Sequence, residues 1–194
     1  MKFIQFQLFG ITVLLISLVL NVQKVKADEY YTFTSTEPQD SYECLAEALY
    51  FEAAQDGDLG MYLVGKVIIN RHYDTQYEFK DLNTICEVVH QPSRNPAKPW
   101  ECAFSYHCDG KPEIVPDHPL EVAAMYAAEA MAYSLLNDRR SIDFTDGALY
   151  YTQPQIDRGW MLNTTITVTY LNHVFRKPKE IKFNNELEGL GYEH

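Results

Sequence analysis

One glutamate of the chain is predicted to lie among apolar side chains, where ionisation of its carboxyl group costs free energy. Residues 44–57 (CLAEALYFEAAQDG) predict a helix of about three turns that ends at Gly57, because glycine just past the last turn is the commonest helix stop. The positions i, i+3, i+4 and i+7 of one helix face are Leu45, Ala48, Leu49 and Glu52. Glu43 and Glu47 point to the opposite side, which we expect to be solvated. The pattern therefore places Glu52 in an apolar stripe.

A carboxyl group in such a stripe has a specific chemical use. Burial of the ionised form costs free energy, so the pKa rises and the group keeps its proton near neutral pH. A glutamic acid that is protonated at that pH is a general acid, suited to cleaving a glycosidic bond. The competing interpretation is structural, because Glu52 lies near the helix end and could turn to water and pair with a lysine or arginine.

Six segments of the chain resemble, in the same order, the bacterial cell-wall hydrolase family typified by the spore-cortex lytic enzymes SleB and CwlJ. They are Tyr50-Phe-Glu-Ala53, Val67-Ile-Ile-Asn-Arg71, Asn83-Thr-Ile-Cys-Glu-Val-Val-His-Gln91, Cys102-Ala-Phe-Ser-Tyr-His-Cys-Asp-Gly110, Gly147-Ala-Leu-Tyr-Tyr151 and Asn172-His-Val-Phe175. The family has Tyr-Gln where this chain has His90-Gln91, and Trp-Thr where it has Tyr106-His107. The resemblance covers about residues 44–176.

The resemblance implies a function and a site. It implies a lysozyme-like fold with peptidoglycan in a cleft between a helical part and a sheet, and it makes Glu52 the catalytic residue. The residues expected to bind substrate are Tyr106, Tyr150, Tyr151 and His173. The family's Arg-Gly-Glu after the catalytic Glu-Ala is replaced by Ala54-Gln-Asp56, so the chain lacks that positive charge beside Glu52.

The chain has four cysteines, which in an exported protein read first as two disulfides. Three pairings are possible and the sequence does not decide among them; we favour Cys44 with Cys86 and Cys102 with Cys108. The alternative is a zinc site of Cys102, His107 and Cys108 with a fourth ligand, although the cysteine spacing is not the usual one. We expect no metal and no cofactor.

The N-terminal region predicts that the protein is exported. Residues 1–27 combine a basic start with a short apolar run and read as a signal peptide cut after Ala27, with an uncleaved anchor as the alternative. Residues 28–40 are expected to form a flexible leader, 41–176 the catalytic domain and 177–194 a loose tail. The expected location is the periplasm or the extracellular space.

The net charge of the chain limits the classes of partner that it is expected to bind. Cleavage after Ala27 removes three lysines and no acids, which takes the net charge from −11 to −14. Such a surface excludes nucleic acid, which needs basic stripes. We expect peptidoglycan as the partner, no stable membrane association after signal removal, and a monomer.

The order of elements indicates an α+β fold. Helices are expected at about 41–54 (capped by Ser41), 58–72 (capped by Asp58), from Thr84 to before Pro92, and 117–137 (capped by Asp117), followed by strands at 147–152 and 165–170. In the last helix we expect a packed face of Ala123, Tyr126, Ala127, Ala130 and Met131. Arg71 is interpreted as a solvated or helix-capping cation in preference to one that orients a carboxylate or a peptide stem.

The number of available acids guides the choice of mechanism. Glycosidases usually need two carboxylates, and only Glu52 is predicted in an apolar face. Asp56, Asp109 and Asp146 each precede a glycine, where aspartate suits turns. One acid suffices for lytic transglycosylation, which we therefore favour. The alternatives are a true muramidase, a zinc amidase, for which His118-x-x-Glu121 is a weak signal, and a non-catalytic cell-wall-binding protein.

Overall fold

The computed structural model describes residues 40–93, 97–98, 102–138, 141–156 and 159–179, all within one compact unit. The predicted signal peptide, the leader up to residue 39 and the tail from residue 180 lie outside the described residues. Within the described ranges, no helix combines the length and apolar character that a membrane crossing requires.

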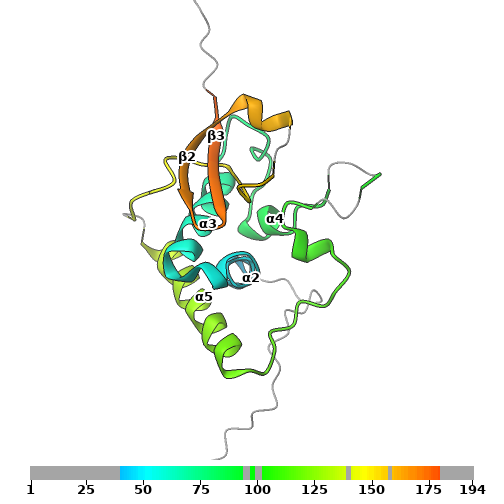
Figure 1. The fold of residues 1–194 in the computed structure, drawn as a ribbon, viewed down its shortest axis with the longest axis vertical. Helices are drawn as coiled ribbons and strands as arrows, with labels where there is room; N and C mark the ends of the chain where they lie inside the picture. Colours follow the sequence, from blue (N-terminus) through cyan, green and yellow to red (C-terminus); the bar gives the residue numbers. More distant parts are fainter. Residues whose placement is uncertain (1–39, 94–96, 99–101, 139–140, 157–158, 180–194) are drawn as a thin grey trace, which may run out of the picture. The chain divides into compact units, whose positions relative to one another are not determined.

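A helical part surrounds one central helix. The helices are α2 (Ser41–Ala53), which runs on into the 3-10 turn η1 (Ala54–Asp56), α3 (Gly57–His72), α4 (Ile85–Val89) and α5 (Pro119–Asn137). Helix α2 packs against α3, α4 and α5 (Figure 1). Every residue of α2 from 44 to 50 is buried, so this helix contributes to the core on all sides.

Three helices start at other caps than predicted. Asp40, not Ser41, caps α2, and its Oδ1 accepts hydrogen bonds of 2.9 Å from two amides of the first turn. Helix α3 begins one residue before the expected cap Asp58. His118, not Asp117, caps α5, with its Nδ1 accepting from an amide of the first turn at 3.3 Å. For α2 and α5 the observed cap lies one residue from the predicted one. The cap of α3 is Asp56, two residues before Asp58, and its side chain makes no capping hydrogen bond.

Two glycines of α3 allow neighbouring side chains to approach the helix closely. A Cβ on Gly65 would lie 2.3 Å from Cδ1 of Leu135 and 3.2 Å from Cδ2 of Leu49. A Cβ on Gly60 would lie 2.3 Å from Cβ of Asp56. Glycine at position 65 therefore lets α3 pack closely against α5 and α2. Glycine at position 60 lets Asp56 lie directly against α3.

The predicted packing face of α5 was only partly right, because Ala127 and Met131 pack against the core but the other three residues are exposed. The residues that α5 buries are Met125, Ala128, Ala132 and Leu135. Tyr126, on the predicted face, is 60% exposed. Because α5 is apolar almost all round, its hydrophobic pattern alone does not select the buried face.

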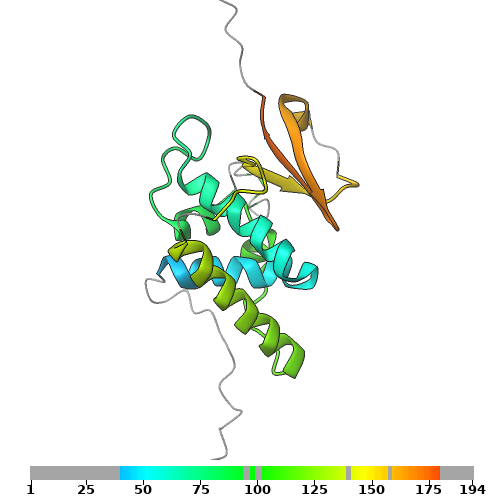
Figure 2. The same cartoon turned by 90° about the vertical axis from the view of Figure 1, so that its left-hand side faces the viewer.

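A small antiparallel sheet completes the fold. Strands β1 (Tyr150–Thr152), β2 (Thr164–Tyr170) and β3 (His173–Pro178) pair in the order β1-β3-β2. The sheet lies to one side of the helical part (Figure 2), and β1 contacts α3. The predicted α+β class is confirmed.

Strand β3 was not predicted, and Lys177 and Pro178 end this strand instead of starting the tail. A bulge between Ile166 and Val168 interrupts the register of β2 with β3, and Ile166 is 52% exposed.

The favoured disulfide pairing is confirmed by the structure. Cys44 and Cys86 join α2 to α4, and Cys102 and Cys108 close a short loop that carries the 3-10 turn η2 (Ser105–Cys108). Both cysteines of the alternative zinc site are therefore bonded to each other and are not available to a metal.

Candidate active site

Two adjoining cavities form a cleft between the helical part and the sheet. One has a volume of about 320 Å³ and the other about 750 Å³. Both are lined by Glu52, Ser105, Tyr151, Thr152, Gln153 and Ile156. The walls come from α2 with η1, from the loop closed by the second disulfide, and from the ends of β1 and β3. Glu52 therefore lies where the two cavities meet.

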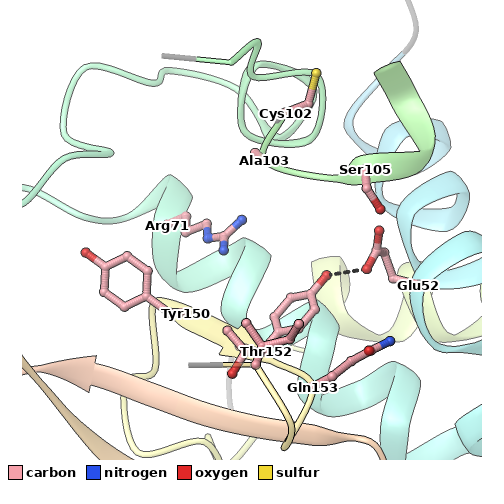
Figure 3. Close-up of a pocket in the computed structure, with 10 residues that line it drawn as sticks. Glu52, Arg71, Cys102, Ala103, Ser105, Tyr150, Thr152 and Gln153 are labelled. Atoms are coloured by element: carbon pink, nitrogen blue, oxygen red, sulfur yellow. Dashed lines mark hydrogen bonds between the residues drawn. The ribbon is translucent and has the colours of Figure 1, made fainter. Parts of the chain in front are cut away.

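The carboxyl group of Glu52 is held by one tyrosine. The Tyr151 hydroxyl donates a hydrogen bond of 2.9 Å to Oε2 of Glu52, drawn as a dashed line in Figure 3. Burial raises the pKa of Glu52, while the bond from Tyr151 and the charge of Arg71 act against this rise. Burial and the neighbouring carboxylate raise the pKa of Tyr151 well above its usual value, so its hydroxyl remains a donor. Glu52 is thus oriented, and burial favours its protonated form.

Arg71 is buried in this cleft, and its interpretation as a solvated or capping cation was wrong. Its side chain is 6% exposed, and its Nε donates a hydrogen bond of 2.8 Å to the carbonyl oxygen of Leu149. The guanidinium lies 4.8 Å from the ring centre of Phe79 and 5.3 Å from that of Phe104. Its Nη1 has no hydrogen-bond partner among the described residues, and the side chain lines the smaller cavity (Figure 3). Arg71 supplies a positive charge whose effect reaches Glu52.

The last turn of α3 positions strand β1 and its tyrosines. The Asn70 amide donates hydrogen bonds to Asp143 Oδ2 at 2.9 Å and to the Ala148 carbonyl oxygen at 3.1 Å. Asp143 also accepts from the amides of Thr145 at 2.8 Å and Gly147 at 2.9 Å. Although burial acts in the opposite direction, these bonds lower the pKa of Asp143. The loop before β1 is thereby fixed to α3, which sets where Tyr151 meets Glu52.

A second carboxylate lies in the larger cavity. Asp56 is 8% exposed, and its Oδ2 lies 2.7 Å from Nδ1 of His173, which is 7% exposed. As interpreted, Asp56 lies in the turn before Gly57, where it ends η1, but its side chain is buried against the start of β3. The ring of His173 stands edge-on to that of Tyr151, with centres 5.0 Å apart. Asp56 and Glu52 therefore belong to one connected group.

The two remaining predicted substrate-binding residues lie at different ends of the cleft. Tyr106 lines the larger cavity, and its ring stacks on Phe51 with centres 4.7 Å apart and planes at 21°. Tyr150 lines the smaller cavity. Burial and then the charge of Glu78 raise the pKa of Tyr150 to about 12. The structure thus brings Glu52 and all four predicted partners to one cleft.

Sequence reasoning missed two polar residues of the cleft and misplaced one acid of α2. Ser105 points toward the Glu52 carboxylate, and Gln153 lies on the opposite side of it (Figure 3). Ser105 begins the short 3-10 turn η2 and Gln153 follows β1, so neither lies in a segment long enough for a periodic pattern to predict its direction. Glu47, expected on a solvated face, is 2% exposed. The helical pattern could not show this, because α4 and η2 cover that face of α2.

The pair His118 and Glu121, a weak signal for a zinc amidase, is engaged in structural contacts. His118 caps α5, and Glu121 accepts a hydrogen bond of 2.7 Å from the Tyr50 hydroxyl. This bond links α5 to the central helix.

The comparison with protein families gives a match over most of the domain. The model of the cell wall hydrolase family matches residues 55–176. The chain belongs to the cell wall hydrolase family. The match begins three residues after Glu52, so the role of Glu52 is argued from the cleft.

Among solved structures, the chain is similar to the catalytic domain of the germination-specific lytic transglycosylase SleB from Bacillus anthracis. The identity is 21%, the likeness covers 74% of this chain and 99% of that chain, and the TM-score is 0.48. Comparison with curated protein sequences gives no match.

Proposed function

We propose that this cell wall hydrolase is a lytic transglycosylase that cleaves the glycosidic bonds of peptidoglycan, with Glu52 as its single catalytic acid and base. The observation that supports this proposal most is the place of Glu52. Its carboxyl group lies where two cavities meet, is oriented by Tyr151, and has its pKa raised by burial. A glycan strand that runs through both cavities would present one glycosidic bond to Glu52.

The reaction then needs two proton transfers at one carboxyl group. Glu52 gives its proton to the oxygen of the scissile bond, and the substrate's N-acetyl group stabilises the positive charge at the sugar carbon. The Glu52 carboxylate next takes the proton of the 6-hydroxyl of the same muramic acid, whose oxygen closes the anhydro ring on that carbon. The residue returns to its starting form, and no metal or cofactor takes part.

The other cleft residues would bind and orient the strand. Tyr106 offers a ring, since aromatic faces stack on sugars, and His173 and Tyr150 lie on the sheet side of the cleft. Arg71 has a buried Nη1 without a partner among the described residues, which a carboxylate of the substrate's peptide stem would satisfy. We therefore assign Arg71 to substrate positioning.

The test compares two glutamates of the same helix. Glu52→Gln keeps the shape of the side chain and removes its proton chemistry, so we expect release of soluble fragments from purified peptidoglycan to fall about 10²–10⁴-fold. Glu43→Gln is the matched control, because Glu43 lies exposed in the first turn of α2. Unchanged activity in Glu52→Gln would contradict the assignment. Tight peptidoglycan binding without any cleavage by the wild type would instead indicate a non-catalytic binding protein.

A second candidate, a true hydrolase, is favoured by one observation. Asp56 lines the same cavity as Glu52, so a second carboxylate is present to activate a water molecule. Its contact of 2.7 Å with His173 makes it less available as a base, and we rank this candidate second. Asp56→Asn should lower hydrolysis by about 10²–10⁴-fold if Asp56 is the base, and should leave the identity of the products unchanged if it is not.

We also propose that the protein works as a monomer outside the cytoplasm. The two disulfides support this location, because such bonds persist in oxidising compartments. Fractionation of cells that produce the full chain, with mass analysis of the N-terminus, tests both export and cleavage after Ala27. A chain found reduced in the cytoplasm would contradict the proposal.

A further inference from the structure

Three potential metal ligands meet beside the cleft but outside it. Glu47 comes from α2, His90 directly follows α4, and His107 belongs to η2. One ligand atom of each lies within 4.8 Å of the other two, and none of the three lines either cavity. We propose that Glu47, His90 and His107 bind one divalent transition-metal ion of the Zn²⁺ type, which fixes the loop of the second disulfide to α2 and α4.

The burial of Glu47 is the first argument. Its side chain is 3% exposed, and an ionised carboxylate at such a depth requires a compensating positive charge. Its Oε1 lies 3.5 Å from Nε2 of His90. A bound cation would compensate Glu47 at every pH at which the carboxylate is ionised.

The arrangement of the two imidazoles is the second argument. The rings of His90 and His107 stack with centres 4.3 Å apart and planes at 20°. Each of the three side chains has one ligand atom within 4.8 Å of the other two. A metal binds an imidazole nitrogen in the plane of its ring, so the rings would rotate out of the stack to bind one ion.

The distances fit a small ion after a modest closure. Zn²⁺ binds nitrogen and oxygen at about 2.0–2.2 Å, which places the ligand atoms of a tetrahedron roughly 3.3–3.6 Å apart. The contact of 3.5 Å between His90 and Glu47 already has this length. The widest separation of 4.8 Å exceeds it by about 1.5 Å at most, within the reach of side-chain rotation. Two imidazoles and a carboxylate favour Zn²⁺, Ni²⁺ or Cu²⁺ over Mg²⁺ and Ca²⁺.

The place of the cluster indicates a structural role. The metal would join three segments far apart in the sequence, and His107 directly follows Ser105 and Tyr106, which line the cleft. A fixed loop would keep Tyr106 stacked on Phe51. Because no member of the cluster lines the cleft, the ion would not contact the substrate.

The experiment uses the folded, disulfide-bonded full chain after removal of metal with EDTA. Zn²⁺ is titrated in by calorimetry, and we expect one ion bound per chain. His107→Gln and His90→Gln should each weaken this binding by at least about 100-fold. His118→Asn is the matched control with unchanged affinity, because His118 lies outside the cluster and asparagine also caps helices.

A second measurement needs no variant. Imidazole nitrogen signals of the wild type are followed by NMR during the Zn²⁺ titration, and we expect those of His90 and His107 to shift together and saturate at one equivalent. Absence of saturable binding would overturn the proposal and leave the cluster as a plain ion pair. Saturable binding that shifts other histidines, or that survives both glutamine variants, would overturn it as well.

Discussion

The hydrogen bond between Tyr151 and Glu52 sets how acidic the proposed catalyst is. Tyr151→Phe removes the hydroxyl that lies 2.9 Å from Oε2 of Glu52 and keeps the ring packed against His173 and Phe175. A hydrogen bond to a charged group contributes about 1.5–3 kcal/mol, which corresponds to roughly 1–2 pKa units. Because this bond stabilises the ionised carboxylate, its loss should raise the pKa of Glu52 further.

The consequence is a shift of the pH profile. Glu52 must be protonated to act as the acid, so activity declines as pH rises through its pKa, and this decline forms the alkaline limb of kcat/KM. We expect Tyr151→Phe to move that limb to higher pH by about 1–2 units. The measurement is the initial rate of fragment release from labelled peptidoglycan, at limiting substrate, across acidic to alkaline buffers.

A neighbouring tyrosine provides the control. Tyr150→Phe removes a hydroxyl from the adjacent residue, whose pKa is affected by burial and Glu78 and not by Glu52. The alkaline limb of this variant should stay at the wild-type position. A limb that stays in place in Tyr151→Phe, or that moves equally in both variants, would refute the argument that the Tyr151 bond controls Glu52.

Three further predictions concern stability. Gly65→Ala should lower the free energy of unfolding by about 1–3 kcal/mol in urea titrations because its Cβ would overlap a leucine of α5, whereas the control Gly159→Ala should change it little. Replacing Cys44 and Cys86 by alanine should lower the free energy of unfolding by about 4 kcal/mol in the chain-entropy model, since the bond closes a loop with a sequence separation of 42. Glu52→Gln should stabilise the fold as pH rises above the unfolded-state pKa of glutamate, because the unfolded carboxyl group then ionises more readily than the buried one, and should not do so below that pKa. A gain in stability from Glu52→Gln that is the same at all pH values would contradict the burial argument.

The helices and the acid were predictable because their signals are local. The cap and apolar face of a helix lie within a few residues of each other, and Thr84 with Glu87 gave the correct start of α4. The apolar stripe predicted where Glu52 lies, while its catalytic role was expected from the resemblance and stays a prediction. Tyr151 was expected in the site from the resemblance, and its hydroxyl contacts Glu52 directly.

The errors concern residues whose surroundings come from distant segments. Glu47 lies on the side of α2 that α4 and η2 cover, and Arg71 is buried by rings from other elements. Asp56 has the sequence context of a turn but is buried against β3, a strand that was not predicted. In each case a long-range contact determines whether a charged side chain is solvated, and a helical or turn pattern holds no information about that contact.

The proposed reaction is tested most directly by mass spectrometry of the fragments that the wild type and Glu52→Gln release from peptidoglycan. We expect anhydro-muramic ends from the wild type and none from the variant. Reducing ends one water heavier would contradict transglycosylation and would direct attention to Asp56 as the second carboxylate. Free stem peptides, or products that persist in Glu52→Gln, would contradict the choice of Glu52 itself.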